Sequence, residues 1–224
     1  MVRAVVFDMY ETLITLFEAP LYFSAEMARD AGVPVEDFRR AWYPSEADRT
    51  LGYLSFEEAL APVLRQFGCY TPELLARMGD RRRAAKREAF AHLHPQILPM
   101  LDALKARGVR IGLITNCFLE EAEYIRRSDL YPYFHTAMLS CAEGLSKPDP
   151  AIFLRCAEGL GVELQQCLYV GDGGSRELET ARSLGMQAAQ AAWYLKDGAL
   201  QPSGRKPEFI QLEAPLDVLC LLDN

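Results

Sequence analysis

Asp8, Lys147, Asp172 and Glu177 are ionisable residues that lie after short apolar runs or in the loops that follow them. An ionised carboxylate such as Asp8 can attack an electrophile and form an ester that water then hydrolyses. The positive charge of Lys147 would stabilise the ionised carboxylate and attract an incoming anion. Oxygen ligands from Asp8 and Asp172 suit Mg²⁺. Together these residue types suit anion or metal chemistry, and they could support hydrolysis through a covalent intermediate with magnesium as a cofactor.

Two further residues extend this candidate site, and each also has a purely structural interpretation. The hydroxyl of Thr115 could hydrogen-bond a transferring oxygen, or it could only pack at a strand end. Glu177 could orient a metal-bound water or ligate the metal through it. A carboxylate in the first turn of a helix is also favoured by the helix dipole alone. Gly173 and Gly174 would let the backbone turn tightly beside an ion.

The segments that must position these residues alternate between short apolar strands and amphipathic helices. This alternation predicts an α/β fold, a parallel sheet with helices on both faces. Ligands of such sheets bind beyond the carboxyl ends of the strands. Asp8, Thr115, Lys147 and Asp172 follow successive strands, so we expect them to meet. The predicted strands are residues 2–7, 109–114, 136–139, 167–170 and 187–192, and the predicted helices are 97–107, 152–160 and 177–184.

A long helical segment interrupts the alternation between the first two strands. It carries four helical patterns, at residues 21–31, 35–42, 56–67 and 72–90, with no strand between them. We predict a cap domain at residues 19–94, inserted into a core made of residues 1–18 and 95–224. The basic run that includes Arg82 and Lys86 is interpreted as a solvated helix face rather than a nucleic-acid patch.

At this point the sequence resembles the haloacid dehalogenase superfamily of hydrolases. Four motifs occur in the family's order: Asp8 after the first strand, Thr115-Asn116 after the second, Ser-Lys147-Pro-Asp-Pro, and Gly-Asp172-Gly-Gly with Glu177 beyond it. The helical cap resembles the C1 type of subfamily I. The resemblance implies a Rossmann-like core and covalent catalysis by an aspartate. It extends from residue 3 to about residue 190.

The resemblance also suggests the role of each residue. The predicted catalytic residues are Asp8, Tyr10, Thr115 and Lys147. Magnesium would be held by Asp8, the backbone carbonyl of Tyr10, Asp172 and Glu177. Thr12, Asn116 and Arg49 are predicted to bind substrate, Arg49 from the cap by a bidentate contact with a carboxylate or phosphate. Trp42 is expected in the core of the cap, and Cys117 as a small buried residue.

The sequence departs from the phosphatase pattern at Tyr10, where the family's phosphatases carry a second Asp as general acid and base. Tyrosine at this place resembles the 2-haloacid dehalogenases, whose halide leaves without a proton. Other positions oppose that interpretation. Asp172 keeps a metal-binding carboxylate that dehalogenases lack, and Phe153 replaces their tyrosine six residues after the lysine. Glu11, where glycine is common, is a weaker candidate for a displaced acid.

We therefore predict a Mg²⁺-dependent, phosphatase-type hydrolase of a small phosphorylated metabolite with an altered acid step. A 2-haloacid dehalogenase is the alternative. A catalytically degraded binding protein of the same fold is the second alternative, since the usual general acid is missing. Replacing Asp8 by Asn should abolish turnover in either enzyme and matter little in a binding protein.

Composition limits the partners and the compartment. The formal net charge of −7 argues against nucleic acid or an anionic membrane as main partner, because both attract basic surfaces. The acidic excess lies outside residues 20–95, where acidic and basic side chains balance.

The six cysteines form no CxxC pair, which favours free thiols and a cytoplasmic location. The single HxH motif is too little for a zinc site. The oligomeric state stays open.

Overall fold

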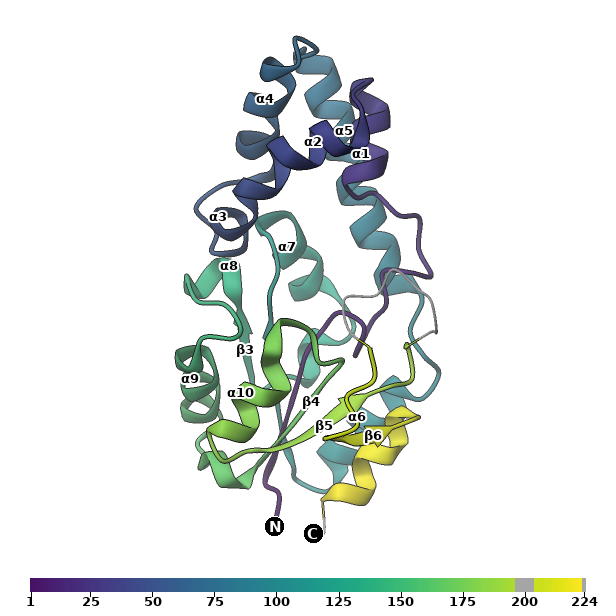
Figure 1. Ribbon diagram of the computed structural model, residues 1–224. Helices are drawn as coiled ribbons and strands as arrows, with labels where there is room; N and C mark the ends of the chain where they lie inside the picture. The colour runs from purple at the N-terminus through teal and green to yellow at the C-terminus, as the bar shows by residue number, and fades with distance from the viewer. Residues whose placement is uncertain (196–203, 223–224) are drawn as a thin grey trace.

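The computed structural model describes residues 1–195 and 204–222. Its core is a six-stranded sheet in the order β3-β2-β1-β4-β5-β6, and every neighbouring pair is parallel. The predicted α/β fold with a Rossmann-like parallel sheet and a helical insertion is confirmed. Figure 1 shows the sheet in the lower half of the molecule and the inserted helices above it. The strands are β1 (Ala4–Phe7), β2 (Arg110–Thr115), β3 (Thr136–Leu139), β4 (Cys167–Gly171), β5 (Gln187–Ala191) and β6 (Ile210–Leu212).

Strand β1 lies inside the sheet and is buried on both faces. Val5 and Phe7 belong to the larger apolar cluster, while Ala4 and Val6 belong to the cluster on the opposite face. This alternation follows from the two-residue period of a strand. Helices of the core therefore cover both faces. α6 (Ile97–Ala106), α7 (Leu119–Arg127) and the 3₁₀ segment η6 (Pro215–Leu221) pack in the first cluster, and α9 (Pro150–Leu160) and α10 (Glu177–Ser183) in the second.

The inserted helices form a cap with an apolar core of its own. Phe38, Trp42, Phe56, Leu60 and Met78 are buried together there, apart from the two clusters of the sheet. Trp42 contacts both phenylalanines, at ring-centroid distances of 6.3 Å and 5.6 Å, so its predicted place in the cap core is confirmed. The cap helices are α1 (Ser24–Ala31), α2 (Val35–Trp42), α3 (Glu46–Thr50), α4 (Phe56–Gln66) and α5 (Pro72–Glu88).

Long helix α5 leads from the cap back to the core, and the N-terminus lies at the far end of the core from the cap (Figure 1). Ser55 and Thr71 begin α4 and α5 by accepting hydrogen bonds from backbone N–H groups of the first turn. The boundaries proposed for the cap, residues 19 and 94, stay a prediction. Among the described residues, no helix combines the length and apolar character needed to cross a membrane.

The predicted strands and helices match the observed ones to within a few residues. The sequence analysis missed α7, the short helices α3 and α8 (Ser140–Glu143), and strand β6. Strand β6 has only three residues, too few for a recognisable alternation. α7 begins after Phe118 without a capping Ser, Thr, Asp or Asn, and therefore lacks the usual signal of a helix start.

One interpretation of the sequence is wrong. The basic run on α5 is not uniformly solvated, because Arg82 and Lys86 are each only 5% exposed. Arg82 Nε lies 3.2 Å from Glu120, and Lys86 Nζ lies 2.6 Å from Glu121. These carboxylates belong to α7 of the core, so this face of α5 is the junction between cap and core. The sequence of α5 alone does not show that two of its basic residues pair with carboxylates on α7, which is distant in the chain.

Candidate active site

The sheet order reverses beside β1, since the chain passes from β1 to β2 and β3 on one side and then crosses to β4 on the other. Ligands of open parallel sheets bind at such a reversal, beyond the carboxyl ends of the strands. Asp8 follows β1 there, and Asp172 follows β4. Both line a cavity of about 510 Å³, here called the main cavity, together with Tyr10, Glu11 and Asn116.

Lys147 lies between two buried carboxylates. Its Nζ donates a hydrogen bond to Asp8 Oδ1 at 2.6 Å and another to Glu177 Oε2. Glu177 also accepts from the hydroxyl of Tyr169, at 2.9 Å, and from the backbone N–H of Gly173, at 3.1 Å. The sequence analysis placed Lys147 near Asp8, and the loop that carries it brings the two together as expected.

Burial dominates the electrostatics of this group. It raises the pKa of Asp8 above its usual value, with Lys147 opposing that shift and Asp172 adding to it. Burial also raises the pKa of Glu177 to about 8, again against the pull of Lys147. Burial alone would lower the pKa of Lys147, but Asp8 and Glu177 outweigh it and raise the pKa. Lys147 is therefore a permanent cation among carboxylates that need more positive charge.

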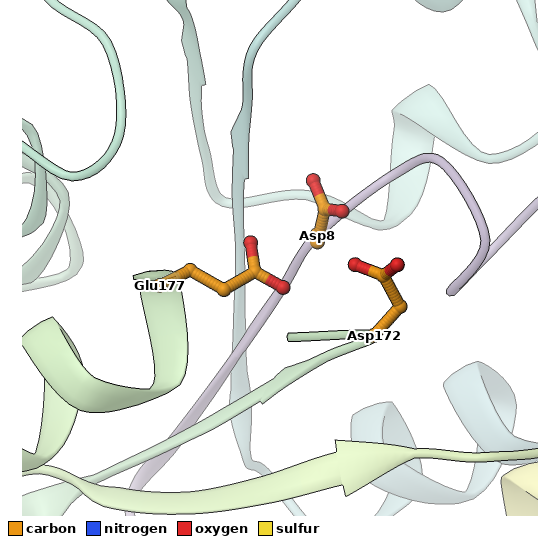
Figure 2. A group of neighbouring side chains, drawn as sticks. All are labelled: Asp8, Asp172 and Glu177. Atoms are coloured by element: carbon orange, nitrogen blue, oxygen red, sulfur yellow. The ribbon is translucent and has the colours of Figure 1, made fainter. Parts of the chain in front are cut away.

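Asp8, Asp172 and Glu177 offer oxygen atoms that all lie within 4.8 Å of one another. Figure 2 shows the three carboxyl groups converging, from the end of β1, the end of β4 and the start of α10. With all three carboxyl groups ionised, one lysine leaves two negative charges unbalanced, and a divalent cation would offset them and favour the ionised forms. Hard oxygen donors of this kind are the ligands that Mg²⁺ prefers. The residues present therefore fit a magnesium ion.

The loop after β4 is shaped around Asp172. The backbone N–H of Gly174 donates to Asp172 Oδ1 at 2.9 Å. Gly173 has a φ of 95°, and Ser175 and Arg176 also have positive φ values, of 51° and 52°. Left-handed backbone at residues other than glycine costs energy and often marks functional loops. The tight turn predicted from the two glycines is present, and it carries the chain directly from Asp172 to Glu177.

Two buried threonine hydroxyls, one at the end of β2 and one in the turn after β1, have no hydrogen-bond partner among the described residues. They are Thr12 Oγ1 and Thr115 Oγ1, and both side chains are fully buried. An unsatisfied buried hydroxyl costs free energy, so a partner from a bound group would relieve it. Thr115 ends β2, next to β1, which is where the sequence analysis expected a donor for a transferring oxygen. This geometry supports that role for Thr115 and a binding role for Thr12.

Asn116 ties the lysine loop to the end of β2. Its side-chain oxygen accepts from Lys147 N at 2.8 Å, and its Nδ2 donates to Lys147 O at 3.0 Å. The same Nδ2 lies 3.3 Å from Ser175 Oγ. Asn116 was predicted to bind substrate. It lines the main cavity and also fixes the position of Lys147.

Tyr10 lines the main cavity, but its hydroxyl is buried near the carboxylate of Glu121. Burial raises its pKa well above the usual value, and the nearby carboxylate of Glu121 adds to the shift. Its ring lies 5.2 Å from Lys86 Nζ. The hydroxyl thus belongs to the charged cap–core junction. A catalytic role for Tyr10 stays a prediction.

Glu11 is buried at the edge of the main cavity with a φ of 57°. Its two carboxylate oxygens accept from Thr15 Oγ1 at 2.7 Å and from Leu16 N at 2.8 Å. Those bonds close the turn that follows β1. Glu11 therefore has a structural role that the sequence did not reveal.

The structure places Arg49 outside the main cavity. It lines a neighbouring space between cap and core, whereas the cap arginine that reaches the main cavity is Arg39. Arg39 donates to Ser24 Oγ at 3.2 Å and pairs with Glu36 at 2.7 Å. Which face of a short cap helix meets the core depends on tertiary packing, so the sequence could not select Arg39. Cys117 is 1% exposed, as predicted.

Two supporting residues escaped the sequence analysis. Tyr169 lies inside the apolar run of β4 and has the appearance of a core aromatic, yet its hydroxyl contacts Glu177. Gln190 is fully buried on β5, and its Nε2 donates to the backbone carbonyl of Asp172 at 2.6 Å. A polar group within an otherwise apolar buried strand is the sequence signal that could have identified both residues.

A family model described as haloacid dehalogenase-like hydrolase matches residues 2–185. The chain belongs to this family. Members similar to it include a glyceraldehyde 3-phosphate phosphatase of Methanopyrus kandleri, 28% identical over 202 residues that cover 83% of this chain and 82% of the relative. Another is a phosphatase of Mycobacterium tuberculosis, 28% identical over 84% of this chain and 86% of that protein.

Among solved structures, the 2-haloacid dehalogenase of Pseudomonas syringae superposes with a TM-score of 0.70. It is 24% identical and covers 100% of this chain and 99% of its own. A haloacid dehalogenase-like phosphatase from Thermococcus onnurineus superposes with a TM-score of 0.64 at 20% identity, over 98% and 97% of the two chains. Since dehalogenase and phosphatase fit the fold comparably well, only the residues of the site can separate the two chemistries.

Proposed function

We propose that this haloacid dehalogenase-like hydrolase is a Mg²⁺-dependent phosphatase that acts on small phosphorylated metabolites. The observation that carries the proposal is the buried group of Asp8, Asp172 and Glu177, with oxygens within 4.8 Å of one another. A dehalogenase does not need a bound cation, because the halide leaves as a stable anion and the substrate has no phosphoryl oxygens whose charge must be neutralised. Asp172 and Glu177 buried beside the nucleophile are therefore best explained by a bound cation.

In the first step, a carboxylate oxygen of Asp8 attacks the phosphorus of the ester. The bond to the leaving oxygen breaks, and the phosphoryl group stays on Asp8 as a mixed anhydride. Lys147, 2.6 Å from Asp8 Oδ1, keeps the carboxylate ionised and offsets charge on the phosphoryl oxygens. The free hydroxyl of Thr115 donates to one of those oxygens. Magnesium held by Asp8, Asp172 and Glu177 would supply further charge neutralisation.

In the second step, water attacks the phosphorus and releases inorganic phosphate and free Asp8. General acid or base catalysis of such steps is typically worth ~10²–10⁴ in rate. The usual aspartate for this role is replaced by Tyr10, whose pKa is raised and whose hydroxyl lies at the cap–core junction. The enzyme therefore favours esters whose leaving group departs without a proton, such as aryl phosphates.

The relatives support a small substrate. Two of the proteins it resembles are phosphatases, one of them named for glyceraldehyde 3-phosphate. A main cavity of about 510 Å³ under a cap suits a molecule of that size. We propose a small, anionic phosphate monoester as the substrate and a cytoplasmic setting, with the oligomeric state left open.

The 2-haloacid dehalogenase is the second candidate, and Tyr10 is the observation that favours it. Phosphate release from a panel of phosphate monoesters and chloride release from 2-chloropropionate, measured with the same protein, separate the two. Our proposal predicts phosphate release and no enzymatic chloride release. Chloride release without phosphate release would overturn it.

Asp8→Asn distinguishes an enzyme from a binding protein. The amide is a poor nucleophile, so the variant should lose all measurable turnover of every ester that the wild type hydrolyses. Asp149→Asn is a suitable control, because Asp149 lies outside the buried carboxylate group and begins α9. An Asp8→Asn variant that keeps wild-type turnover would refute catalysis by Asp8.

A further inference from the structure

A second cavity of about 240 Å³ lies between cap and core. We call it the cap–core cavity. Three cationic side chains line it: Arg49 on α3 and Arg82 and Lys86 on α5. Each of the three is 5% exposed or less. Charged side chains are rarely buried without a partner, so each needs an explanation.

Arg82 and Lys86 have partners on the core. Arg82 lies 3.2 Å from Glu120 and 3.4 Å from Glu121, and Lys86 lies 2.6 Å from Glu121. The two carboxylates balance these two cations and no more. Any further positive charge in the cavity is therefore left without a buried counter-charge.

Arg49 is that further charge. Its guanidinium carbon lies over two aromatic rings, 4.0 Å from the centroid of Trp42 and 4.4 Å from that of Phe118. These cation–π contacts do not supply hydrogen-bond acceptors for the N–H groups of the guanidinium. Among the described residues it makes one side-chain hydrogen bond, from Nε to Ser45 Oγ at 3.1 Å, and no ion pair. Glu46 on the rim of the cavity is exposed and does not pair with it.

Arg49 therefore offers the cap–core cavity N–H donors that have no acceptor among the described residues. Contacts with two aromatic rings restrict the position of the guanidinium, and its fork of N–H donors suits a planar or tetrahedral anion. Burial and the neighbouring Arg82 lower the pKa of Arg49 to about 10, which still leaves it charged at neutral pH. A bound anion would remove the cost of burying this charge.

The cap–core cavity adjoins the main cavity. Phe23, Ser24 and Tyr43 line both spaces. Phe118, which covers one face of Arg49, stands two residues after Asn116 of the main cavity. A single extended ligand could thus have one end at Asp8 and the other at Arg49.

We propose that the cap–core cavity binds a second anionic group of the substrate, carried at the end remote from the scissile phosphate. The substrates would then be phosphate monoesters that bear a carboxylate or a second phosphate, with Arg49 as the specificity-determining residue. This inference rests on the proposed phosphatase function and narrows its substrate class.

The test compares aryl phosphates that differ only in the remote charge. The charged series is 4-(phosphonooxy)benzoate, 4-(phosphonooxy)phenylacetate and 4-(phosphonooxy)phenylpropanoate, and the neutral series consists of their methyl esters. A charge-assisted contact of ~1.5–3 kcal/mol corresponds to ~10- to 100-fold in kcat/KM. We expect one charged member to exceed its methyl ester by that factor. The same comparison of kcat/KM, made between a bisphosphate as long as the preferred carboxylate ester and the corresponding monophosphate, tests whether the remote group can be a phosphate.

Two variants show whether Arg49 causes the preference. Arg49→Met keeps an unbranched chain against Trp42 and Phe118 and should remove most of the charge preference, expressed as the ratio of the two kcat/KM values. Arg40→Met is the matched control, since Arg40 is an exposed cap arginine outside this cavity, and it should keep the ratio. A wild-type ratio of one overturns the second anionic site even where Arg49→Met does not fold.

The outcomes separate the two proposals. Mg²⁺-dependent hydrolysis of both series at equal kcat/KM overturns the second anionic site and leaves the phosphatase function in place. A preference that survives Arg49→Met also overturns the assignment. No hydrolysis of any ester refutes the phosphatase function, and the substrate class falls with it.

Discussion

A β-carbon on Gly52 would lie 2.1 Å from the backbone carbonyl oxygen of Cys141. The loop after cap helix α3 therefore touches helix α8 of the core with no room for a side chain. Ser140 strengthens the same contact, because its hydroxyl donates to the carbonyl of Thr50 at 2.8 Å. The cap is docked on the core beside the site, and a docked cap keeps water from the reaction.

Gly52→Ala should hold the cap away from the core. The added methyl group would meet backbone atoms of Cys141, which cannot move aside as a flexible side chain could. We expect kcat/KM to fall at least tenfold, measured on an aryl phosphate. Gly32→Ala is the control, since Gly32 also lies in the cap with positive φ, 68° against 78°, but a methyl group there meets nothing within 4 Å.

In both variants an alanine must adopt left-handed backbone, which lowers the stability of the fold by about 1 kcal/mol in each. Equal losses of stability with unequal losses of activity would therefore isolate cap docking. Equal activity in the two variants would show that the contact of Gly52 with Cys141 does not matter for turnover.

Lys147→Met tests the charge that lies against the nucleophile. Without Lys147, the buried carboxylates lose their one paired cation, and the transferring phosphoryl group loses a positive neighbour. We expect turnover to fall by ~10² or more, while Mg²⁺ binds at least as tightly as before because the site is more negative. Lys105→Met, at an exposed lysine of α6, should behave as the wild type. Loss of Mg²⁺ affinity in Lys147→Met would argue against this division of roles.

Tyr10→Phe tests whether the phenol donates a proton. The phenol lies at the cap–core junction, with its hydroxyl near Glu121 and its ring 5.2 Å from Lys86 Nζ, so removing the hydroxyl should cost less than tenfold in kcat on an aryl phosphate. The same comparison on an alkyl phosphate, whose leaving group needs a proton more, should show no larger loss. A drop of ~10² or more on the alkyl ester alone would identify Tyr10 as the general acid.

The Glu121→Gln substitution at the cap–core junction should lower the free energy of unfolding by an amount that depends on pH. Burial alone would raise the pKa of Glu121, but Lys86 and Arg82 together lower it below its ordinary value of 4.5. A carboxyl with a lowered folded-state pKa stabilises the fold above its unfolded pKa, and that stability is lost as the pH falls through the folded pKa. Breaking a buried pair costs about 3–5 kcal/mol at neutral pH.

The free energy of unfolding, measured in urea at a series of pH values, checks this. Wild type and Glu121→Gln should differ near pH 7 and converge as the pH falls below 4.5. Glu123→Gln on the same helix, an exposed residue, should track the wild type throughout. A difference that stays constant into acid would mean that Glu121 is not stabilised by its charge.

Much of the site could be predicted because a parallel sheet places its carboxyl ends along one edge. Asp8 and Asp172 follow adjacent strands, and the loop with Lys147 lies over the same edge, so their order in the chain was enough to bring them together. The strands needed only short apolar runs to be recognised.

The cap–core junction could not be predicted for a physical reason. Arg82 and Glu120 are 38 residues apart on different helices, and each alone has the pattern of a surface charge. Only the docking of α5 on α7 buries them. For the same reason the sequence suggested a cap arginine but could not tell that Arg39 faces the main cavity and Arg49 the neighbouring one.

The decisive measurement is the rate of hydrolysis of 4-nitrophenyl phosphate by the wild-type protein, first stripped of metal with a chelator and then given Mg²⁺. The buried group of Asp8, Asp172 and Glu177 predicts no turnover in chelator, recovery on adding Mg²⁺, and strongly weakened recovery in Asp172→Asn. Turnover that is equal with chelator and with Mg²⁺, or no turnover in either case alongside chloride release from 2-chloropropionate, would contradict a magnesium-dependent phosphatase.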